Sequence, residues 1–163
     1  MTRHDVNQLI HDGHLELQIL VHKPVTIVWN RFIHMHTWVT SHVIEQVQGE
    51  PGEIGAVIRA SFKQAAELGM PLPHYHFCKT IKVVIGSQYL FKTYSEKCGS
   101  YGLSIIGFDD ARFESLGNDT RLTFNFYGEY SGEYLAKEPS DGDHMLKNLQ
   151  NLKSLVEQPI DNG

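Results

Sequence analysis

The chain has 163 residues, of which 41% are hydrophobic and 20% are charged, so it is the size of one globular domain with its own core. Its formal charge is −5, and its 14 lysines and arginines are scattered among 19 acidic residues, which argues against a nucleic-acid partner held by phosphate contacts. No apolar run approaches the roughly 20 residues of a membrane span, and residues 1–13 lack the apolar stretch of an export signal. We therefore expect a cytoplasmic protein with no membrane span.

Ten histidines are the anomaly of the composition, because protonating all of them would change the charge from −5 to +5. The surface charge should accordingly change sign between about pH 7 and pH 5. His74 and His76 share one face of a predicted strand and would suit a metal ion, but the sequence offers no third ligand. We expect neither a metal site nor a cofactor.

The N-terminal part predicts one strand and two short helices within a single domain, 1–163, whose core spans about 14–157 between flexible termini. Apolar residues alternate over His14–His22, as they do in a strand. Pro24 then opens a helix at its first position, where its missing N–H costs nothing, and a second short helix covers 34–40.

The rest of the chain predicts strands joined by turns and one long helix. The helix spans Asp141–Glu157, because Met145, Leu149, Leu152 and Val156 recur at helical spacing. Strands linked by hairpins form an antiparallel sheet that needs one face covered, so we expect an α+β fold. The predicted strands are 43–48, 56–63, 75–85, 88–97, 101–116 and 121–130.

The two cysteines are predicted to be reduced. A tight turn at 85–88 would place Cys78 opposite Ser95 and Cys98 opposite Tyr75. The resulting offset between Cys78 and Cys98 is too long for a disulfide.

Helix starts and turns carry a resemblance to a known superfamily. The segments are Lys23–Trp29 entering the first helix, Gly49–Gly55 between two strands, Gly117–Leu122 before the last strand, and the closing helix Met145–Val156. With the order of elements, they resemble the helix-grip fold of the START-like (SRPBCC) superfamily, which includes birch pollen allergen-like and polyketide cyclase/dehydrase-like proteins. The resemblance implies a curved antiparallel sheet of about seven strands around the C-terminal helix, with two small helices after the first strand. It also implies a cavity between sheet and helix for a hydrophobic or amphipathic small molecule.

Strand parity predicts which side chains face that cavity. In the last strand Leu122, Phe124 and Phe126 are apolar and alternate with polar residues, so they point inward. Pairing across the turn at 117–120 then places Phe113, Ala111 and Asp109 on the same face. An unbroken strand would bury Asp109 and raise its pKa, making it a general acid or a polar anchor. We favour the alternative, a bulge at Gly107–Asp110 that returns Asp109 to water.

The preceding hairpin gives a weaker prediction. The face with more charges should be outside, so His74, His76, Cys78 and Thr80 face inward with Tyr89, Phe91 and Thr93, although Lys82 falls on the inward set. Trp29 is predicted in the core, and Trp38 either packs in the core or lines the mouth of the cavity. The candidate ligand-binding residues are Trp38, His76, Tyr89, Phe91, Asp109, Phe113, Phe124, Phe126, Met145 and Leu149.

Three functions remain open at this point. The first is binding of a hydrophobic small molecule, anchored by His76, Tyr89 or Asp109. The second is polyketide cyclase-like acid/base chemistry in the same cavity, although no nucleophilic or catalytic motif is present. The third is a protein-interaction adaptor with a filled cavity. An open cavity with one polar group favours binding, a converging histidine and carboxylate favour catalysis, and a collapsed cavity favours the adaptor. Residues 64–73 are a candidate lid.

Overall fold

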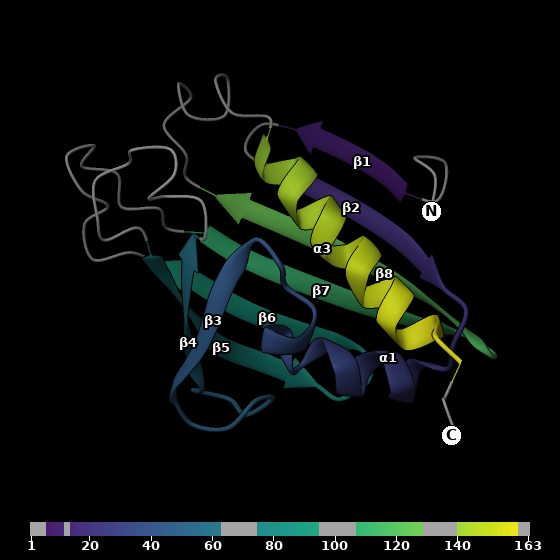
Figure 1. The fold of residues 1–163 in the computed structure, drawn as a ribbon, viewed down its shortest axis with the longest axis horizontal. Coiled ribbons are helices and arrows are strands. Elements are labelled where there is room, and N and C mark those ends of the chain that lie inside the picture. The colour runs from purple at the N-terminus through teal and green to yellow at the C-terminus, as the bar shows by residue number, and fades with distance from the viewer. Residues whose placement is uncertain (1–5, 12–13, 63–74, 95–106, 129–139, 160–163) are drawn as a thin grey trace.

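The computed structural model describes residues 6–11, 14–62, 75–94, 107–128 and 140–159. In these ranges the strands form one antiparallel sheet of eight strands in the order β1-β2-β8-β7-β6-β5-β4-β3 (Figure 1). The strands are β1 (Val6–His11), β2 (His14–Val21), β3 (His42–Gln48), β4 (Val57–Phe62), β5 (Tyr75–Val84), β6 (Gln88–Tyr94), β7 (Gly107–Leu116) and β8 (Asp119–Gly128). The helices are α1 (Val25–Phe32), the short 3₁₀ helix η2 (Met35–Thr37) and α3 (Ser140–Glu157).

The predicted element order is confirmed, with one addition at the N-terminus. The seven predicted strands correspond to β2–β8, and β1 adds an eighth by pairing with β2 along one edge. Pro24 is the N-cap of α1, so the helix begins at Val25, one residue later than predicted. The predicted helix over 34–40 is shorter, because only Met35–Thr37 form a 3₁₀ turn.

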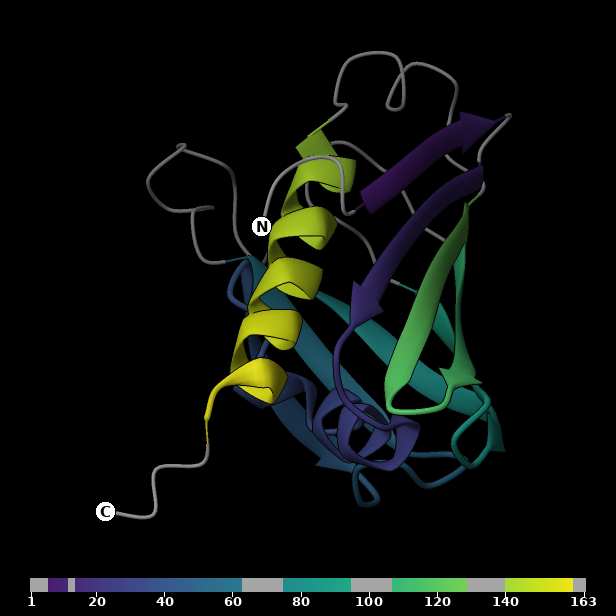
Figure 2. The same ribbon diagram turned by 90° about the vertical axis from the view of Figure 1, so that its right-hand side faces the viewer.

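The long helix α3 lies across the inner face of the curved sheet, over β2 and β8 (Figures 1 and 2). Its buried residues Leu149 and Leu152 face apolar side chains of both strands, among them Leu17 and Phe124. We call this part, β2, β7 and β8 with α3, the helix-covered half. No helix in the described part of the chain is long and apolar enough to cross a membrane.

Aromatic rings form the centre of the core. Trp29 and Phe32 of α1 contact Tyr89 of β6 and Phe113 of β7, with ring centroids 5.0–5.9 Å apart. These edge-to-face contacts join the helix-covered half to β3–β6, which we call the pocket half. The prediction that Trp29 belongs to the core is confirmed.

The register of the last hairpin is regular where we predicted a bulge. Asp109 pairs with Phe91 on β6 and with Phe126 on β8, and the pairing continues without a shift on both sides. Strand alternation therefore turns Asp109 inward, and only 4% of its surface is exposed. The favoured bulge at Gly107–Asp110 was wrong, and the alternative prediction, a buried Asp109, is confirmed.

An irregularity lies instead in β5, where the pairing shifts between Thr80 and Lys82. Thr80 before the shift and Val83 after it both face inward, while Lys82 is exposed. The shift explains why Lys82, which strand alternation alone would turn inward, is exposed. The predicted register is also wrong: the turn pairs Val84 with Gln88, and beyond the shift Cys78 lies opposite Thr93, not Ser95. Cys78 is a buried free thiol, and Cys98 lies outside the described residues.

Candidate ligand pocket

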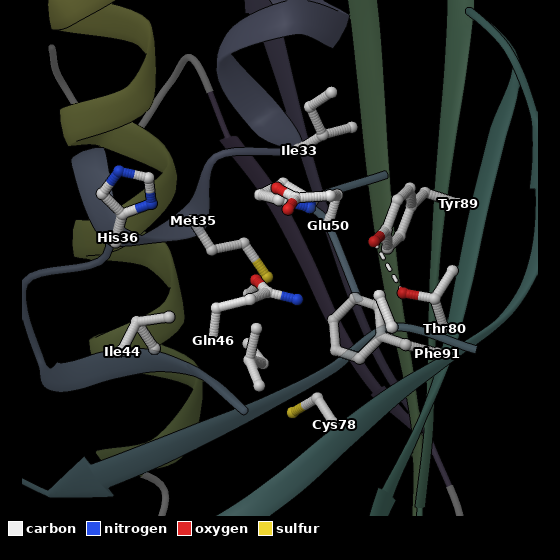
Figure 3. Close-up of a pocket in the computed structure, with 13 residues that line it drawn as sticks. Ile33, Met35, His36, Ile44, Gln46, Glu50, Cys78, Thr80, Tyr89 and Phe91 are labelled. Atoms are coloured by element: carbon white, nitrogen blue, oxygen red, sulfur yellow. Dashed lines mark hydrogen bonds between the residues drawn. The ribbon is translucent and has the colours of Figure 1, made fainter. Parts of the chain in front are cut away.

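A half-open pocket of about 300 Å³ lies on the inner face of the pocket half, beneath the end of α1 and η2 (Figure 3). The described residues that line it are Ile33, Met35, His36, Ile44, Gln46, Glu50, Pro51, Ala56, Ile58, Cys78, Thr80, Tyr89 and Phe91. Its walls thus come from Ile33 directly after α1, from η2, from β3–β6 and from the loop between β3 and β4. None of these residues belongs to α3, so the described pocket differs from the predicted cavity between sheet and helix.

The walls are mainly apolar and the rim is polar. Ile33, Ile44 and Ile58 are partly buried against the core and form much of the wall, with Met35 reaching in from η2. A methionine thioether adapts easily to the shape of a bound molecule. Gln46, Glu50 and His36 are exposed and mark the opening.

The loop over the pocket depends on two glycines with positive φ. Gly49 has a φ of 68°, and a Cβ there would lie 3.1 Å from the Cα of Ala56. Gly52 has a φ of 88°, and a Cβ there would lie 3.2 Å from the Cδ1 of Ile33. Glycine is needed at both positions because other residues rarely adopt this backbone conformation and would crowd these neighbours. The tight path holds Glu50 and Pro51 at the rim.

Two hydroxyl groups supply the polar feature of the inner wall. Thr80 Oγ1 and Tyr89 Oη lie 2.7 Å apart in a buried hydrogen bond. Burial raises the pKa of Tyr89, while hydrogen bonds from the Thr80 side chain and the Gly52 backbone act in the opposite direction. Tyr89 is therefore a neutral hydrogen-bonding group at physiological pH.

Behind the Cys78 wall lies a buried polar chain. The Cys78 Sγ is 3.7 Å from Thr93 Oγ1, and the Thr93 hydroxyl donates a short hydrogen bond to Asp109 Oδ2. Burial raises the pKa of Asp109 to about 7, although the Thr93 hydrogen bond favours the ionised form. Burial, and then the nearby Asp109 charge, raise the pKa of Cys78, so this thiol stays protonated and is a poor nucleophile.

His76 lies at the far end of the same face and contacts a histidine that the sequence did not suggest. Its ring packs edge-to-face against that of His42, with centroids 5.2 Å apart. Burial lowers the pKa of His76 to about 4, so it is neutral at pH 7. His74 lies outside the described residues. Among those described, no group of three histidine, cysteine or acidic side chains could hold a metal ion.

The predicted binding residues divide between the pocket and the core. Tyr89 and Phe91 line the pocket, while Asp109 and His76 lie on the same sheet face outside its lining. Trp38 is fully buried, stacks on Phe32 and donates its Nε1–H to the Phe32 carbonyl, so it lies in the core and not at a cavity mouth. The remaining predicted residues pack in or against the core: Phe113, Phe124, Phe126, Met145 and Leu149.

Most of the pocket residues were missed because they lie on the loop and strands after α1. Ile44 and Gln46 differ in polarity although they share the pocket face, and the opposite face of β3 carries the exposed Val43 and Val47. Alternation therefore points to the wrong face of β3. The glycines of the 49–55 loop were the usable signal, because they indicate a tightly folded turn next to the sheet.

The chain has the helix-grip α+β fold, and solved structures with this fold cover nearly its whole length. A protein of Arthrobacter aurescens is 14% identical, with a TM-score of 0.69 over 95% of this chain and 92% of that one. Ginseng major latex-like protein 151 from Panax ginseng is 14% identical, with a TM-score of 0.65 over 90% and 98%. The Zhui aromatase/cyclase from Streptomyces sp. R1128 is 12% identical, with a TM-score of 0.60 over 92% and 98%.

These similarities support the predicted START-like (SRPBCC) resemblance at the level of the fold. No protein-family model matches the sequence, and no curated protein matches it. Similar folds occur in an aromatase/cyclase and in a latex-like protein, so the function must be argued from the pocket.

Proposed function

We propose that the protein binds an apolar or amphipathic small molecule in the pocket lined by β3–β6, η2 and the residue that follows α1. The observation that carries the proposal is an open pocket of about 300 Å³ with apolar walls and one buried hydroxyl pair, Thr80 and Tyr89. Ligand sites commonly have this composition, with few polar groups that fix orientation, and their volumes begin at about 300 Å³. The adaptor alternative is less favoured because the side chains of the described residues leave this pocket unfilled.

Burial of apolar surface would supply most of the binding energy, at about 25 cal/mol for each Å² removed from water. Met35 and Ile44 would cover one side of the ligand and Phe91 the other. The wall is largely built from β-strands and a 3₁₀ turn anchored to the core, so little ordering would oppose binding.

A cyclase-like enzyme is the second candidate, and Asp109 is the observation that favours it. A buried carboxyl with a pKa of about 7 is suited to proton transfer near neutral pH. However, Asp109 lies behind Cys78 and Thr93, outside the pocket lining. The histidine that lines the pocket, His36, packs against the ring of His34, and no described carboxylate is paired with it. Binding is therefore the better supported proposal.

Filling the pocket tests the binding proposal. The Ile44→Trp variant would place an indole in the pocket, whereas Val43→Trp adds the same group on the exposed opposite face of β3. A panel of fatty acids, quinones and aromatic compounds would be screened by thermal shift, with native mass spectrometry of the protein purified from its own host. A ligand at 100 times its Kd should raise Tm by about 5–10 °C.

We expect wild type and Val43→Trp to respond alike and Ile44→Trp to lose the response. Absence of any response in the folded wild-type protein, together with no co-purified molecule, would overturn the proposal. If the ligand raises the Tm of Ile44→Trp as much as that of wild type, the ligand binds outside this pocket.

A further inference from the structure

The charges around the pocket indicate what kind of ligand it accepts, an inference that rests on the proposed function. Among the described lining residues, the ionisable groups are His36, Glu50, Cys78 and Tyr89, and no lysine or arginine is present. Glu50 is a carboxylate at the rim. Cys78 and Tyr89 hold their protons because burial raises the pKa of each. The described part of the lining therefore offers one negative charge and no fixed positive charge.

The region behind the pocket adds to this negative bias. Asp109 is linked to the pocket wall through Thr93 and Cys78, and its charge acts on the Cys78 thiol. The neighbouring buried groups on the same face, Thr80 and Thr93, are neutral hydroxyls. An anionic ligand would lose its hydration in the pocket without meeting a counter-ion, which is costly in a protein interior.

The hydroxyl pair, by contrast, is suited to one neutral oxygen. Thr80 and Tyr89 carry two hydroxyl protons, and the hydrogen bond between them uses one. Within the described residues the Gly52 backbone N–H also bonds the Tyr89 oxygen, but neither hydroxyl proton has another acceptor, so one proton is available to a bound molecule. A ligand hydroxyl or carbonyl can use this group without carrying charge.

We infer that the pocket selects neutral apolar molecules with one hydroxyl or carbonyl oxygen, and discriminates against the carboxylates of the same skeleton. The apolar walls bind the skeleton, the Thr80–Tyr89 pair orients the oxygen, and the described lining residues offer an anion no cation to pair with. Selectivity thus comes from a missing counter-charge as much as from a contact.

Three probes with one shared ring system test the inference: 2-naphthol, naphthalene and 2-naphthoate. Affinities would be measured at pH 7.5 by calorimetry or by NMR titration of the full chain. We expect 2-naphthol to bind about fivefold more tightly than naphthalene, as one net hydrogen bond provides. We expect 2-naphthoate to bind at least about tenfold more weakly than 2-naphthol.

A positive charge added at the rim of the pocket tests whether the missing counter-charge weakens the binding of the carboxylate. Gln46 lines the pocket on β3 and its side chain is exposed, so Gln46→Lys should bring an ammonium group to the opening without burying it. Val43→Lys makes the same change in net charge on the opposite face of the strand. Gln46→Lys should raise the affinity for 2-naphthoate several-fold relative to that for 2-naphthol, whereas Val43→Lys should leave this ratio as it is in wild type.

The outcomes separate this inference from the proposed function. If 2-naphthol and 2-naphthoate bind wild type equally, or if Val43→Lys rescues 2-naphthoate as well as Gln46→Lys does, the inference is overturned and small-molecule binding stands. If the screening panel and all three probes fail to bind the folded protein, the proposed function itself fails.

Discussion

The two halves of the sheet differ in how their inner face is covered. In the helix-covered half, α3 lies directly on β2 and β8, and residues such as Leu122, Phe124 and Leu149 have at most 1% of their surface exposed. In the pocket half, α1, η2 and the 49–55 loop cover β3–β6 less closely and leave a space of about 300 Å³. A long helix provides a continuous apolar stripe, whereas a short 3₁₀ turn and a loop cannot. The fold thus separates the closely packed part of the core from the pocket along one sheet.

The largest expected effect comes from truncating the packed core. Leu122→Ala leaves a new cavity among side chains that cannot fully collapse, so we expect a loss of about 3–5 kcal/mol in the free energy of unfolding. Ile58→Ala is the matched variant in the pocket half. It enlarges a space that already exists, so we expect a loss of only about 1–2 kcal/mol. Urea unfolding measures both, and equal losses would break the comparison between the halves.

Asp109, at the border of the halves, should make stability depend on pH. Its pKa rises from 3.8 to about 7 on folding, so the folded state holds a proton that the unfolded state releases. The resulting penalty is absent below about pH 4, grows as pH rises to about 7, and is constant above it. The difference of about three pKa units corresponds to up to about 4 kcal/mol.

Asp109→Asn should remove this penalty, so the variant should be the more stable protein at pH 8 and the difference should shrink toward pH 4. Asp110→Asn is the control, since Asp110 pairs with Arg112 on the outer face. Urea unfolding between pH 4 and pH 8 provides the measurement. Parallel stability curves for wild type and Asp109→Asn would mean that water reaches this carboxyl and that the border is not dry.

A smaller effect should follow from cutting the tie between the halves. Asn148 of α3 accepts hydrogen bonds from the backbone N–H groups of Thr40 and Ser41 and from the Thr40 hydroxyl, and it donates to Ser41 Oγ. Asn148→Ala leaves several donors of Thr40 and Ser41 without their partner in a partly buried place, so we expect a loss of about 2 kcal/mol in the free energy of unfolding. Asn151→Ala, on the same helix, removes one bond to the Trp38 carbonyl and should cost about 1 kcal/mol. If both variants unfold like wild type, α3 does not fix the start of β3.

The smallest effect on stability is expected on the outer face of the sheet, which neither α3 nor the pocket residues cover. Glu114 of β7 and Arg121 of β8 lie opposite each other and form an exposed ion pair at 3.0 Å. Glu114→Gln should change the free energy of unfolding by less than about 1 kcal/mol, with the difference decreasing in high salt. A larger change in thermal unfolding would show that the outer face contributes to stability more than its exposure suggests.

The fold could be predicted from sequence because local signals agreed. The alternation of Leu122, Phe124 and Phe126 identified the inner face of β8, and helical spacing from Met145 to Val156 identified α3. β1 was missed because Val6–His11 mixes polar and apolar residues, and its pairing with β2 supplies what its own pattern lacks.

The pocket could be predicted only in part, because it depends on register and loop path. Tyr89 and Phe91 were found from alternation in β6. Thr80 and Cys78 were assigned to the right face, but the shift after Thr80 changes the facing of the residues beyond it, and a one-residue shift leaves no mark in composition. Ile44, Gln46 and Ala56 reach the pocket through the path of the 49–55 loop, which no periodic pattern encodes.

The contact between Trp29 and Tyr89 also gives the protein an internal optical reporter. The chain has two tryptophans, and Trp38 is buried with its Nε1–H bonded to the Phe32 carbonyl, so its emission should be constant. The centroid of the Trp29 indole lies 5.9 Å from that of the Tyr89 ring, and Tyr89 also lines the pocket. A molecule that enters the pocket should alter the fluorescence of Trp29 through a single intervening ring, and occupancy becomes readable without any added label.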